Sequence, residues 1–326
     1  MKYTTLGDTG VRVSRICLGC MSYGSQEWRP WILEEDEAMP FFRTAVEAGI
    51  NFFDTADVYS VGRSEEVTGK ALREYANHEE VVIATKVHGV MGRGPNMRGL
   101  SRKHIVQGCE ASLKRLGIET IDLYQIHRFD PLTPLEETLS ALDLLVRQGK
   151  VRYIGASSGA AWRMAQALAL SDGHDWARFV TMQNHYNLMY REEEREMNPL
   201  CEAEGVGLIP WSPLARGLLA GSRKAVNDLE STTRAGSDDF AQRLYDHAAD
   251  WKVVETLAAV AAEIGHEPAQ VALAWLLSKP GVVAPIIGAT KMAHLEAAIA
   301  AVDVELDDET IERLEAPYEP HAVRGH

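Results

Sequence analysis

Short apolar runs recur at eight places along the chain, with polar or helical segments between them. They begin near residues 16, 50, 81, 121, 151, 179, 206 and 284, and read ICLG, INFFD, VVIATK, IDLYQIH, VRYIGAS, FVTMQ, VGLIPW and APIIG. Most are rich in Val, Ile or Phe and do not alternate cleanly between apolar and polar residues. Continuous runs of this kind are typical of parallel strands buried on both faces of a sheet.

The segments between these runs have helical spacing. Apolar or small residues fall on one helix face in two clear cases, Leu135, Leu139, Leu142 and Val146 in one and Ile105, Cys109, Ser112 and Leu116 in the other. Ser101 is the expected N-cap of the second of these helices, and Gly117 is its expected C-terminal stop. Eight strand-then-helix units predict a (β/α)₈ barrel formed by a single domain over residues 1–326.

The alternative fold is a doubly wound dinucleotide-binding sheet, which should carry G-x-G-x-x-G after its first strand. The sequence has no such run there, nor a G-x-x-x-x-G-K-[ST] motif. The glycine-rich segment GVMGRGPNMRG, residues 89–99, follows the third strand and lacks that spacing. We interpret it as a mobile loop over the mouth of the barrel.

Two segments depart from the repeat. Residues 2–15 have the pattern of a hairpin that turns at Asp8 to Gly10 and could close the barrel floor. The interval 212–283 is too long for one crossover. We expect a long loop over 222–250, then helices over 251–264 and 268–278, the second with Pro268 in its first turn. Loops of such length usually serve a function.

Composition narrows the class of partner. The 326 residues are 46% hydrophobic, which is enough for a large core. A net charge of -14 and a pI near 5.3 repel nucleic acid and anionic membranes, so a small molecule is the expected partner. No signal-like segment follows Met1, and no apolar stretch approaches the roughly 20 residues of a spanning helix. We therefore expect a soluble, cytoplasmic protein.

Cysteine usage agrees with a reducing compartment. Four cysteines do not form a disulfide framework in a chain of this length. Cys17 and Cys20 form a C-x-x-C, but no second pair or nearby histidine completes a zinc site. We interpret them as two ordinary thiols and predict no metal.

Polar side chains stand where three successive strands end. The second strand ends in Asp54, the third in Lys86 and the fourth in His127, and Tyr59 follows the second. Each alone could be a cap, a surface charge, a core imidazole or a half-buried aromatic. Because the carboxyl ends of barrel strands converge on the active face, the four together predict one shared site.

These residue types suit proton donation to a carbonyl. A tyrosine has an ordinary pKa of about 10, and a neighbouring ammonium lowers that pKa. Asp54 could hold Lys86 as an ion pair, while His127 orients an oxygen of the substrate. The predicted site therefore acts on aldehydes or ketones.

The segments FFDTADVYS…SEE, IATK, LYQIHRFD and IGASS resemble the aldo-keto reductase superfamily, whose catalytic tetrad is Asp, Tyr, Lys and His in this order. The resemblance runs from LGDTGVRVSRICLGCMSYG to PIIGAT and the last helix. QIHRFDPLTPLEETLSAL, HYNLMYREEEREM and IPWSPLARG are closest to the bacterial YajO-type reductases. The resemblance to this superfamily implies an NADP-dependent oxidoreductase that reduces aldehydes or ketones to alcohols, with Tyr59 as proton donor.

The resemblance also implies how NADPH binds across the barrel mouth. Ser157, Ser158 and Gln183 would hold the carboxamide, Trp211 would stack on the nicotinamide, and the loop after the seventh strand would wrap the pyrophosphate. The full implied set is Cys20, Met21, Ser157, Ser158, Gln183, Trp211, Ser212, Pro213, Leu214, Gly217, Leu219, Gly288, Thr290, Lys291 and His294. We expect the segment 222–250 to close over the cofactor.

The chain departs from the family pattern at the adenine and 2′-phosphate end of this cofactor and at one carboxamide contact. His294 stands where many relatives carry an arginine, Ala297 and Ala298 replace a Glu-Asn pair, and Ser158 replaces a frequent asparagine. We therefore expect NADPH as the cofactor, with some use of NADH.

Two substrate classes remain open. An aromatic and apolar wall would suit aryl aldehydes, and its candidates are Tyr23, Trp28, Trp31, Met91 and Phe129. A group of arginines in the mouth loops could instead attract a phosphorylated sugar, namely Arg63, Arg93, Arg98 and Arg128.

Two other functions also remain open. In a lyase or synthase acting on a sugar phosphate, Lys86 would be a Schiff-base amine. In a nicotinamide-binding regulatory subunit, turnover would be vestigial. The sequence does not predict the oligomeric state.

Overall fold

The computed structural model describes residues 1–221, 244–245 and 250–325 and contains an eight-stranded sheet in which every neighbouring pair is parallel. In sheet order its strands are β10 (Ile286–Ile287), β3 (Cys17–Gly19), β4 (Phe52–Asp54), β5 (Val82–Val87), β6 (Ile121–Ile126), β7 (Val151–Ser157), β8 (Phe179–Gln183) and β9 (Gly207–Leu208). Parallel bridges from Leu208 to Val282 and from Trp211 to Ile286 join the two edges. The predicted (β/α)₈ barrel and its eight strands are confirmed.

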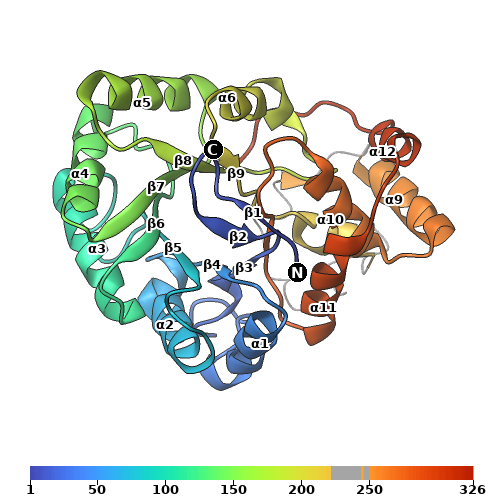
Figure 1. The fold of residues 1–326 in the computed structure, drawn as a ribbon, viewed down its shortest axis with the longest axis horizontal. Coiled ribbons are helices and arrows are strands. Elements are labelled where there is room, and N and C mark those ends of the chain that lie inside the picture. The colour runs from blue at the N-terminus through green and yellow to red at the C-terminus, as the bar shows by residue number, and fades with distance from the viewer. Residues whose placement is uncertain (222–243, 246–249, 326) are drawn as a thin grey trace.

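Helices surround the strands as a ring (Figure 1). They are α1 (Glu35–Glu47), α2 (Arg63–Tyr75), α3 (Arg102–Leu116), α4 (Leu135–Arg147), α5 (Ala161–His174), α6 (Met197–Ala203), α9 (Asp250–Ile264), α10 (Pro268–Ser278), α11 (Met292–Ala300) and α12 (Asp308–Glu315). The backbone N–H of His104 donates to Ser101 Oγ at 3.3 Å, and Gly117 ends α3 with φ 67°. Both predicted ends of α3 are confirmed, as are the helices predicted over 251–264 and 268–278.

A two-stranded hairpin closes one end of the barrel. β1 (Tyr3–Thr5) and β2 (Arg12–Ser14) are antiparallel, and the ribbon crosses the centre of the ring in Figure 1. Leu6 and Val13 are fully buried in the cluster that fills the barrel interior. At Gly7, φ is 60° and a Cβ would lie 2.4 Å from the carbonyl oxygen of Val180, so only glycine fits. The predicted floor is confirmed, and the site must lie at the opposite end, the barrel mouth.

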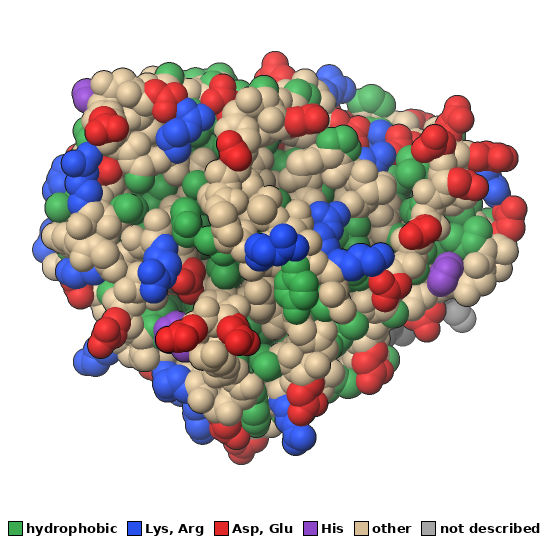
Figure 2. All heavy atoms as spheres, viewed as in Figure 1, with side chains coloured by type: hydrophobic (Ala, Val, Ile, Leu, Met, Phe, Trp, Pro, Cys, Tyr) green, Lys and Arg blue, Asp and Glu red, His purple; other side chains and the backbone are tan. Residues whose placement is uncertain are grey.

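The remaining expectations concern thiols, loops and charge. All four cysteines are free and buried, as ordinary core thiols are. The predicted loop 222–250 lies outside the described residues except for Leu244, Tyr245 and Asp250, which are buried. Within the described ranges, no helix has both the length and the apolar character needed to span a bilayer. Acidic and basic side chains are interspersed on the face shown in Figure 2.

Candidate active site

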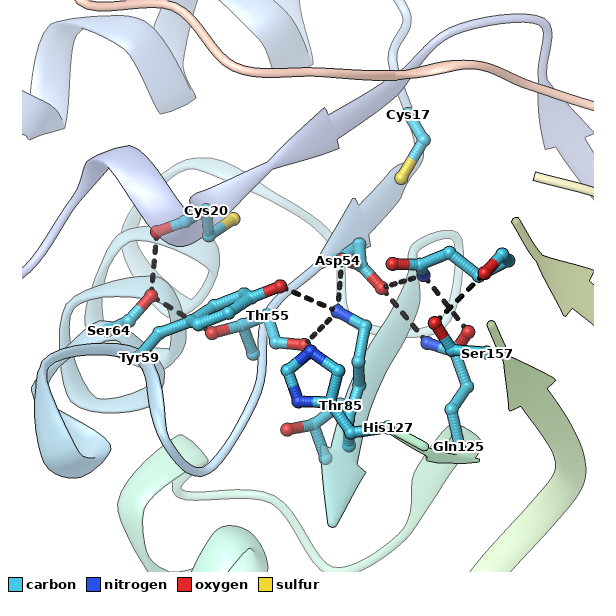
Figure 3. A network of polar contacts seen from close by, with 12 residues as sticks. Cys17, Cys20, Asp54, Thr55, Tyr59, Ser64, Thr85, Gln125, His127 and Ser157 are labelled. Carbon is cyan, nitrogen blue, oxygen red and sulfur yellow. Dashed lines mark hydrogen bonds and ion pairs between the residues drawn. The ribbon is translucent and has the colours of Figure 1, made fainter. Parts of the chain in front are cut away.

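The ammonium of Lys86 is the centre of a polar network at the barrel mouth, and Figure 3 shows its partners Asp54, Thr55 and Tyr59. Its Nζ lies 2.5 Å from Asp54 Oδ2, 2.8 Å from the carbonyl oxygen of Thr55 and 3.3 Å from the hydroxyl of Tyr59. Asp54 and Lys86 end or nearly end adjacent strands, β4 and β5, and both are buried. Three of the four side chains predicted from strand ends therefore share one hydrogen-bonded cluster.

A tight turn returns Tyr59 to this cluster. The backbone N–H of Asp57 donates to the carbonyl oxygen of Lys86 at 3.1 Å, which extends the pairing beyond β4. The 3₁₀ turn Tyr59–Gly62 follows, and Ser60 and Val61 adopt left-handed φ values of 49° and 50°. Non-glycine residues rarely occupy this region, so the surrounding contacts must hold the turn in place.

His127 completes the predicted set. Its imidazole lies edge-on to the ring of Tyr59, with 5.6 Å between ring centroids and an interplanar angle of 83°. Figure 3 shows the side chains of Tyr59 and His127 beside each other. Burial lowers the pKa of His127 well below its ordinary value, and the positive charges of Lys86 and Arg128 lower it further. The imidazole is therefore neutral at physiological pH and can donate or accept one hydrogen bond.

The protonation of Tyr59 differs from the expectation. Lys86 does lower the pKa of the phenol, but burial is the larger effect and raises it above the ordinary value. For Lys86, burial lowers the pKa of the ammonium, yet Asp54 and Tyr59 together raise it above the ordinary value. Tyr59 is therefore a protonated phenol held beside a protonated lysine, which is the state needed to give a proton away.

Two glutamine amides hold the other carboxylate oxygen of Asp54. Nε2 of Gln125 and Nε2 of Gln183 donate to Asp54 Oδ1 at 2.9 and 3.0 Å, and Gln183 Nε2 also lies 3.0 Å from Gln125 Oε1. Sequence reasoning missed Gln125, although it stands two residues before His127 and hence on the same face of the strand. Gln183, expected at the carboxamide, is engaged with Asp54 in this structure.

A second acidic layer, which sequence reasoning also missed, lies behind the cluster. Glu65 accepts from Thr85 Oγ1 and from Arg115 Nε, both at 2.6 Å, and is fully buried. Asp57 is 1% exposed, and neither of its carboxylate oxygens has a hydrogen-bond partner. Burial and the negative charge of Glu65 raise the pKa of Asp57 to about 7.

Backbone strain is concentrated at the barrel mouth. In the described residues, eight non-glycine residues have positive φ, and seven of them lie in loops that follow strands β4, β5, β7 and β9: Ser60, Val61, His88, Ser158, Ser212, Ala215 and Arg216. Such strain is costly and persists mainly where a ligand site needs a particular backbone shape. In the loop after β9, Gly217 adds a fourth left-handed residue.

An aromatic stack stands at the same end. The ring of His185 lies between Tyr190 and Trp211, with centroid distances of 4.2 and 4.3 Å and interplanar angles of 14° and 12°. His185 Nε2 is 2.7 Å from the hydroxyl of Tyr245, and Trp211 Nε1 donates to Ser158 Oγ at 3.0 Å. The indole expected beside a nicotinamide is thus fixed on one face by His185 and at its edge by Ser158.

The other expected cofactor residues divide by exposure. The side chains of Cys20, Pro213 and Leu219 are buried, so only their backbone groups could reach a ligand. Gly288, Lys291 and His294 are exposed at the start of α11, where no side chain caps the backbone N–H groups. Met21, Ser212, Leu214, Gly217 and Thr290 are half-buried, and Ser157 Oγ donates to the carbonyl oxygen of Gln183 at 2.9 Å.

The expected aromatic wall needs correction. Tyr23 is fully buried and packs on Phe41 and Phe42 at 5.7 and 5.1 Å, so it belongs to the core and not to an accessible wall. Trp31 is also buried. Trp28 lies 6.2 Å from the ring of Tyr59 and is suitably placed to contact a substrate.

Two further wall candidates lie on separate loops. The ring of Phe129 packs so closely on Gly159 that a Cβ there would lie 2.3 Å from it. Met91 is half-buried in the loop after β5.

The four arginines are not equivalent. Arg63 forms ion pairs with Glu35 at 2.6 Å and with Glu66 at 2.8 Å, which removes it as a free substrate-attracting charge. Arg93 and Arg98 are exposed in the loop after β5, whereas Arg128 is half-buried beside His127. Only Arg128 of these four therefore lies next to the reactive side chains.

A (β/α)₈ barrel with this cluster at its mouth corresponds to a known family of carbonyl-directed enzymes. The model of the Aldo/keto reductase family matches residues 15–319. A versiconal hemiacetal acetate reductase of Aspergillus parasiticus is 43% identical, over 99% of this chain and 98% of that protein. An aldo-keto reductase of Fusarium vanettenii is 43% identical, over 99% and 93%. A Schizosaccharomyces pombe protein provisionally named an aryl-alcohol dehydrogenase is 42% identical, over 99% and 97%.

The chain therefore belongs to the aldo/keto reductase family and is an oxidoreductase of carbonyl compounds. The expected closeness to the bacterial YajO-type reductases is not supported, because these relatives are fungal.

Proposed function

We propose that this protein is an NADPH-dependent reductase of aldehydes or ketones in which Tyr59 donates the proton. The observation that carries the proposal is the contact of 3.3 Å between the Tyr59 hydroxyl and Lys86 Nζ, itself bound to Asp54 at 2.5 Å. NADPH, when bound, supplies the hydride, for which protein side chains offer no source.

Each side chain has a defined task in this proposal. Tyr59, kept protonated by burial, donates its proton as negative charge develops on the carbonyl oxygen. Lys86 stabilises the phenolate that remains, because its ammonium already lies at hydrogen-bonding distance. Neutral His127 orients the carbonyl oxygen towards Tyr59. Asp54, fixed by Gln125 and Gln183, holds Lys86 charged and in place.

The residues at the mouth fit a nicotinamide cofactor. Trp211 offers a flat ring whose position is fixed by His185 and Ser158, as stacking on a heteroaromatic requires. In the loop after β9, Ser212, Ala215, Arg216 and Gly217 have positive φ, and the N–H groups of Ala215 and Gly217 donate to the carbonyl oxygens of Ser212 and Leu214 at 2.9 and 2.8 Å. A loop turned this tightly can bring other backbone N–H groups to phosphate oxygens. Lys291 and Thr290 precede the uncapped start of α11, which favours a 2′-phosphate and hence NADPH.

The lyase alternative is disfavoured by the state of Lys86. An amine must be unprotonated to form a Schiff base, but Asp54 and Tyr59 raise the pKa of Lys86 above its ordinary value. The names of the fungal relatives, reductases and an aryl-alcohol dehydrogenase, also favour redox chemistry over a regulatory role.

The direct test is to follow the absorbance of reduced nicotinamide after adding an aromatic aldehyde to the protein with NADPH or NADH. We expect aldehyde-dependent oxidation and a lower KM for NADPH. No oxidation with a broad aldehyde panel would contradict the proposal, and trapping of a borohydride-stable adduct at Lys86 would favour the lyase instead.

A further inference from the structure

Arg128 is a half-buried cation that directly follows His127 in the sequence. Its Nη1 donates to the carbonyl oxygen of His127 at 2.6 Å, and it forms no ion pair with any residue in the described part of the chain. A guanidinium has five N–H donors, so this single bond leaves most of the donor fork unused. Half-buried charges are normally paired, which makes the missing partner informative.

The nearest acidic side chains are already occupied. Asp130 accepts from the backbone N–H groups of Leu100 and Leu132, both at 2.9 Å, and from Thr133 Oγ1 at 2.7 Å. Asp54 is held by Lys86 and the two glutamine amides. The other titratable groups that interact electrostatically with Arg128 or His127 are His88, Lys86 and the phenol of Tyr59. None of these is an anion at neutral pH.

A second cation lies close by. The guanidinium of Arg163, in the first turn of α5, stands 5.7 Å from the centroid of the Phe129 ring, and its Nε is buried without a hydrogen-bond partner. Phe129 follows Arg128 in the chain, so the residue that carries this ring contact is adjacent in sequence to Arg128. This local positive charge contrasts with the net charge of -14 of the whole chain.

We propose, on the basis of the function proposed above, that Arg128 binds an oxyanion carried by the carbonyl substrate, a carboxylate or a phosphate. The substrate class is then an anionic aldehyde or ketone whose body rests on Phe129 and Trp28. A guanidinium fork matches either oxyanion with two parallel hydrogen bonds, and partial burial strengthens both. The anionic group would anchor the substrate while its carbonyl lies at Tyr59 and His127.

The test compares matched substrates with the full chain and NADPH. The carboxylate arm uses 4-carboxybenzaldehyde against its methyl ester, and the phosphate arm uses glyceraldehyde 3-phosphate against glyceraldehyde. We expect wild-type kcat/KM to favour the anion in at least one arm by about 10-fold or more. Hydrogen bonds to charged groups make differences of this order, about 10- to 150-fold. The arm with selectivity identifies the oxyanion.

Arg128→Gln should lower that selectivity ratio towards one. Arg128→Lys should give an intermediate ratio, because an ammonium keeps the positive charge but lacks the paired donors of the guanidinium. Arg152→Gln is the matched control, since Arg152 is exposed at the start of β7, on the floor side. Circular dichroism confirms that each variant is folded. A wild-type ratio near one in both arms, or a ratio that Arg128→Gln leaves intact, would overturn the proposal.

Failure of the proposed function would look different, because no aldehyde, neutral or anionic, would be reduced. The inference is then decided by binding of benzoate and inorganic phosphate to the NADP⁺-loaded protein, measured by calorimetry. Binding that weakens about 10-fold or more in Arg128→Gln would support an oxyanion site. Equal binding in the variant and the wild type would refute it.

Discussion

Replacing Lys86 with methionine tests the buried ion pair through both stability and activity. The Lys86 and Asp54 side chains are 0% and 2% exposed, so the substitution leaves a carboxylate in the interior with only two amides beside it. Removing one partner of a buried pair costs about 3–5 kcal/mol. For 326 residues the unfolding entropy is about 0.7 kcal/mol/K, from about 2.1 cal/mol/K per residue. We therefore expect Tm to fall by about 4–7 °C.

Scanning calorimetry of three variants separates the contributions. Lys86→Met combined with Asp54→Leu should recover most of the lost stability, because an apolar pair is often neutral or better in place of a buried ion pair. It should not recover turnover, which needs the ammonium beside Tyr59. Arg43→Met removes an exposed pair with Glu47 and should leave Tm nearly unchanged. If Lys86→Met lowers Tm no more than Arg43→Met, the ion pair does not hold the site as argued.

Three further predictions concern pH, the cofactor and its phosphate. Asp57 keeps its proton in the folded state up to pH about 7 but loses it near pH 3.8 when unfolded, so its contribution to stability is lost as pH rises between these values. Asp57→Asn should therefore raise the unfolding free energy at pH 8 by up to about 4 kcal/mol relative to wild type, or Tm by up to about 6 °C, but should not do so at pH 4. A pH-independent difference in Tm would contradict this. His185→Leu should release Trp211 and so weaken NADPH binding about 2- to 12-fold in a fluorescence titration. His185→Phe keeps the ring stack but loses the contact with Tyr245, and it should restore the affinity for NADPH. Equal affinities in wild type and His185→Leu would show that the stack is irrelevant. Lys291→Met should raise KM for NADPH but not for NADH, and equal changes would remove Lys291 from the 2′-phosphate.

The strand ends could be predicted from the sequence because a polar residue interrupts an apolar run there. Asp54, Lys86 and His127 needed only the rule that strand ends of a barrel converge. The direction of the Tyr59 pKa could not be predicted, because it depends on how deeply the turn Tyr59–Gly62 is packed. Tyr23 was misplaced for a similar reason, since only the packing of Phe41 and Phe42 shows that it is core.

Partners set by register across strands were also beyond the sequence. Gln125 reaches Asp54 because β5 and β6 pair with Lys86 opposite Gln125, a register that no local pattern encodes. Glu65 and Arg115 are 50 residues apart and meet only because α2 packs on α3. The unpaired state of Arg128 depends on where Asp130 points, which is equally a tertiary property.

The central claim is that the hydroxyl of Tyr59 gives its proton to the substrate oxygen. The most direct measurement is single-turnover oxidation of bound NADPH by an aromatic aldehyde in wild type and in Tyr59→Phe, with NADPH affinity measured on the same samples. We predict that the rate falls by at least about 10²- to 10⁴-fold while the affinity changes little. An undiminished rate in Tyr59→Phe would contradict the account.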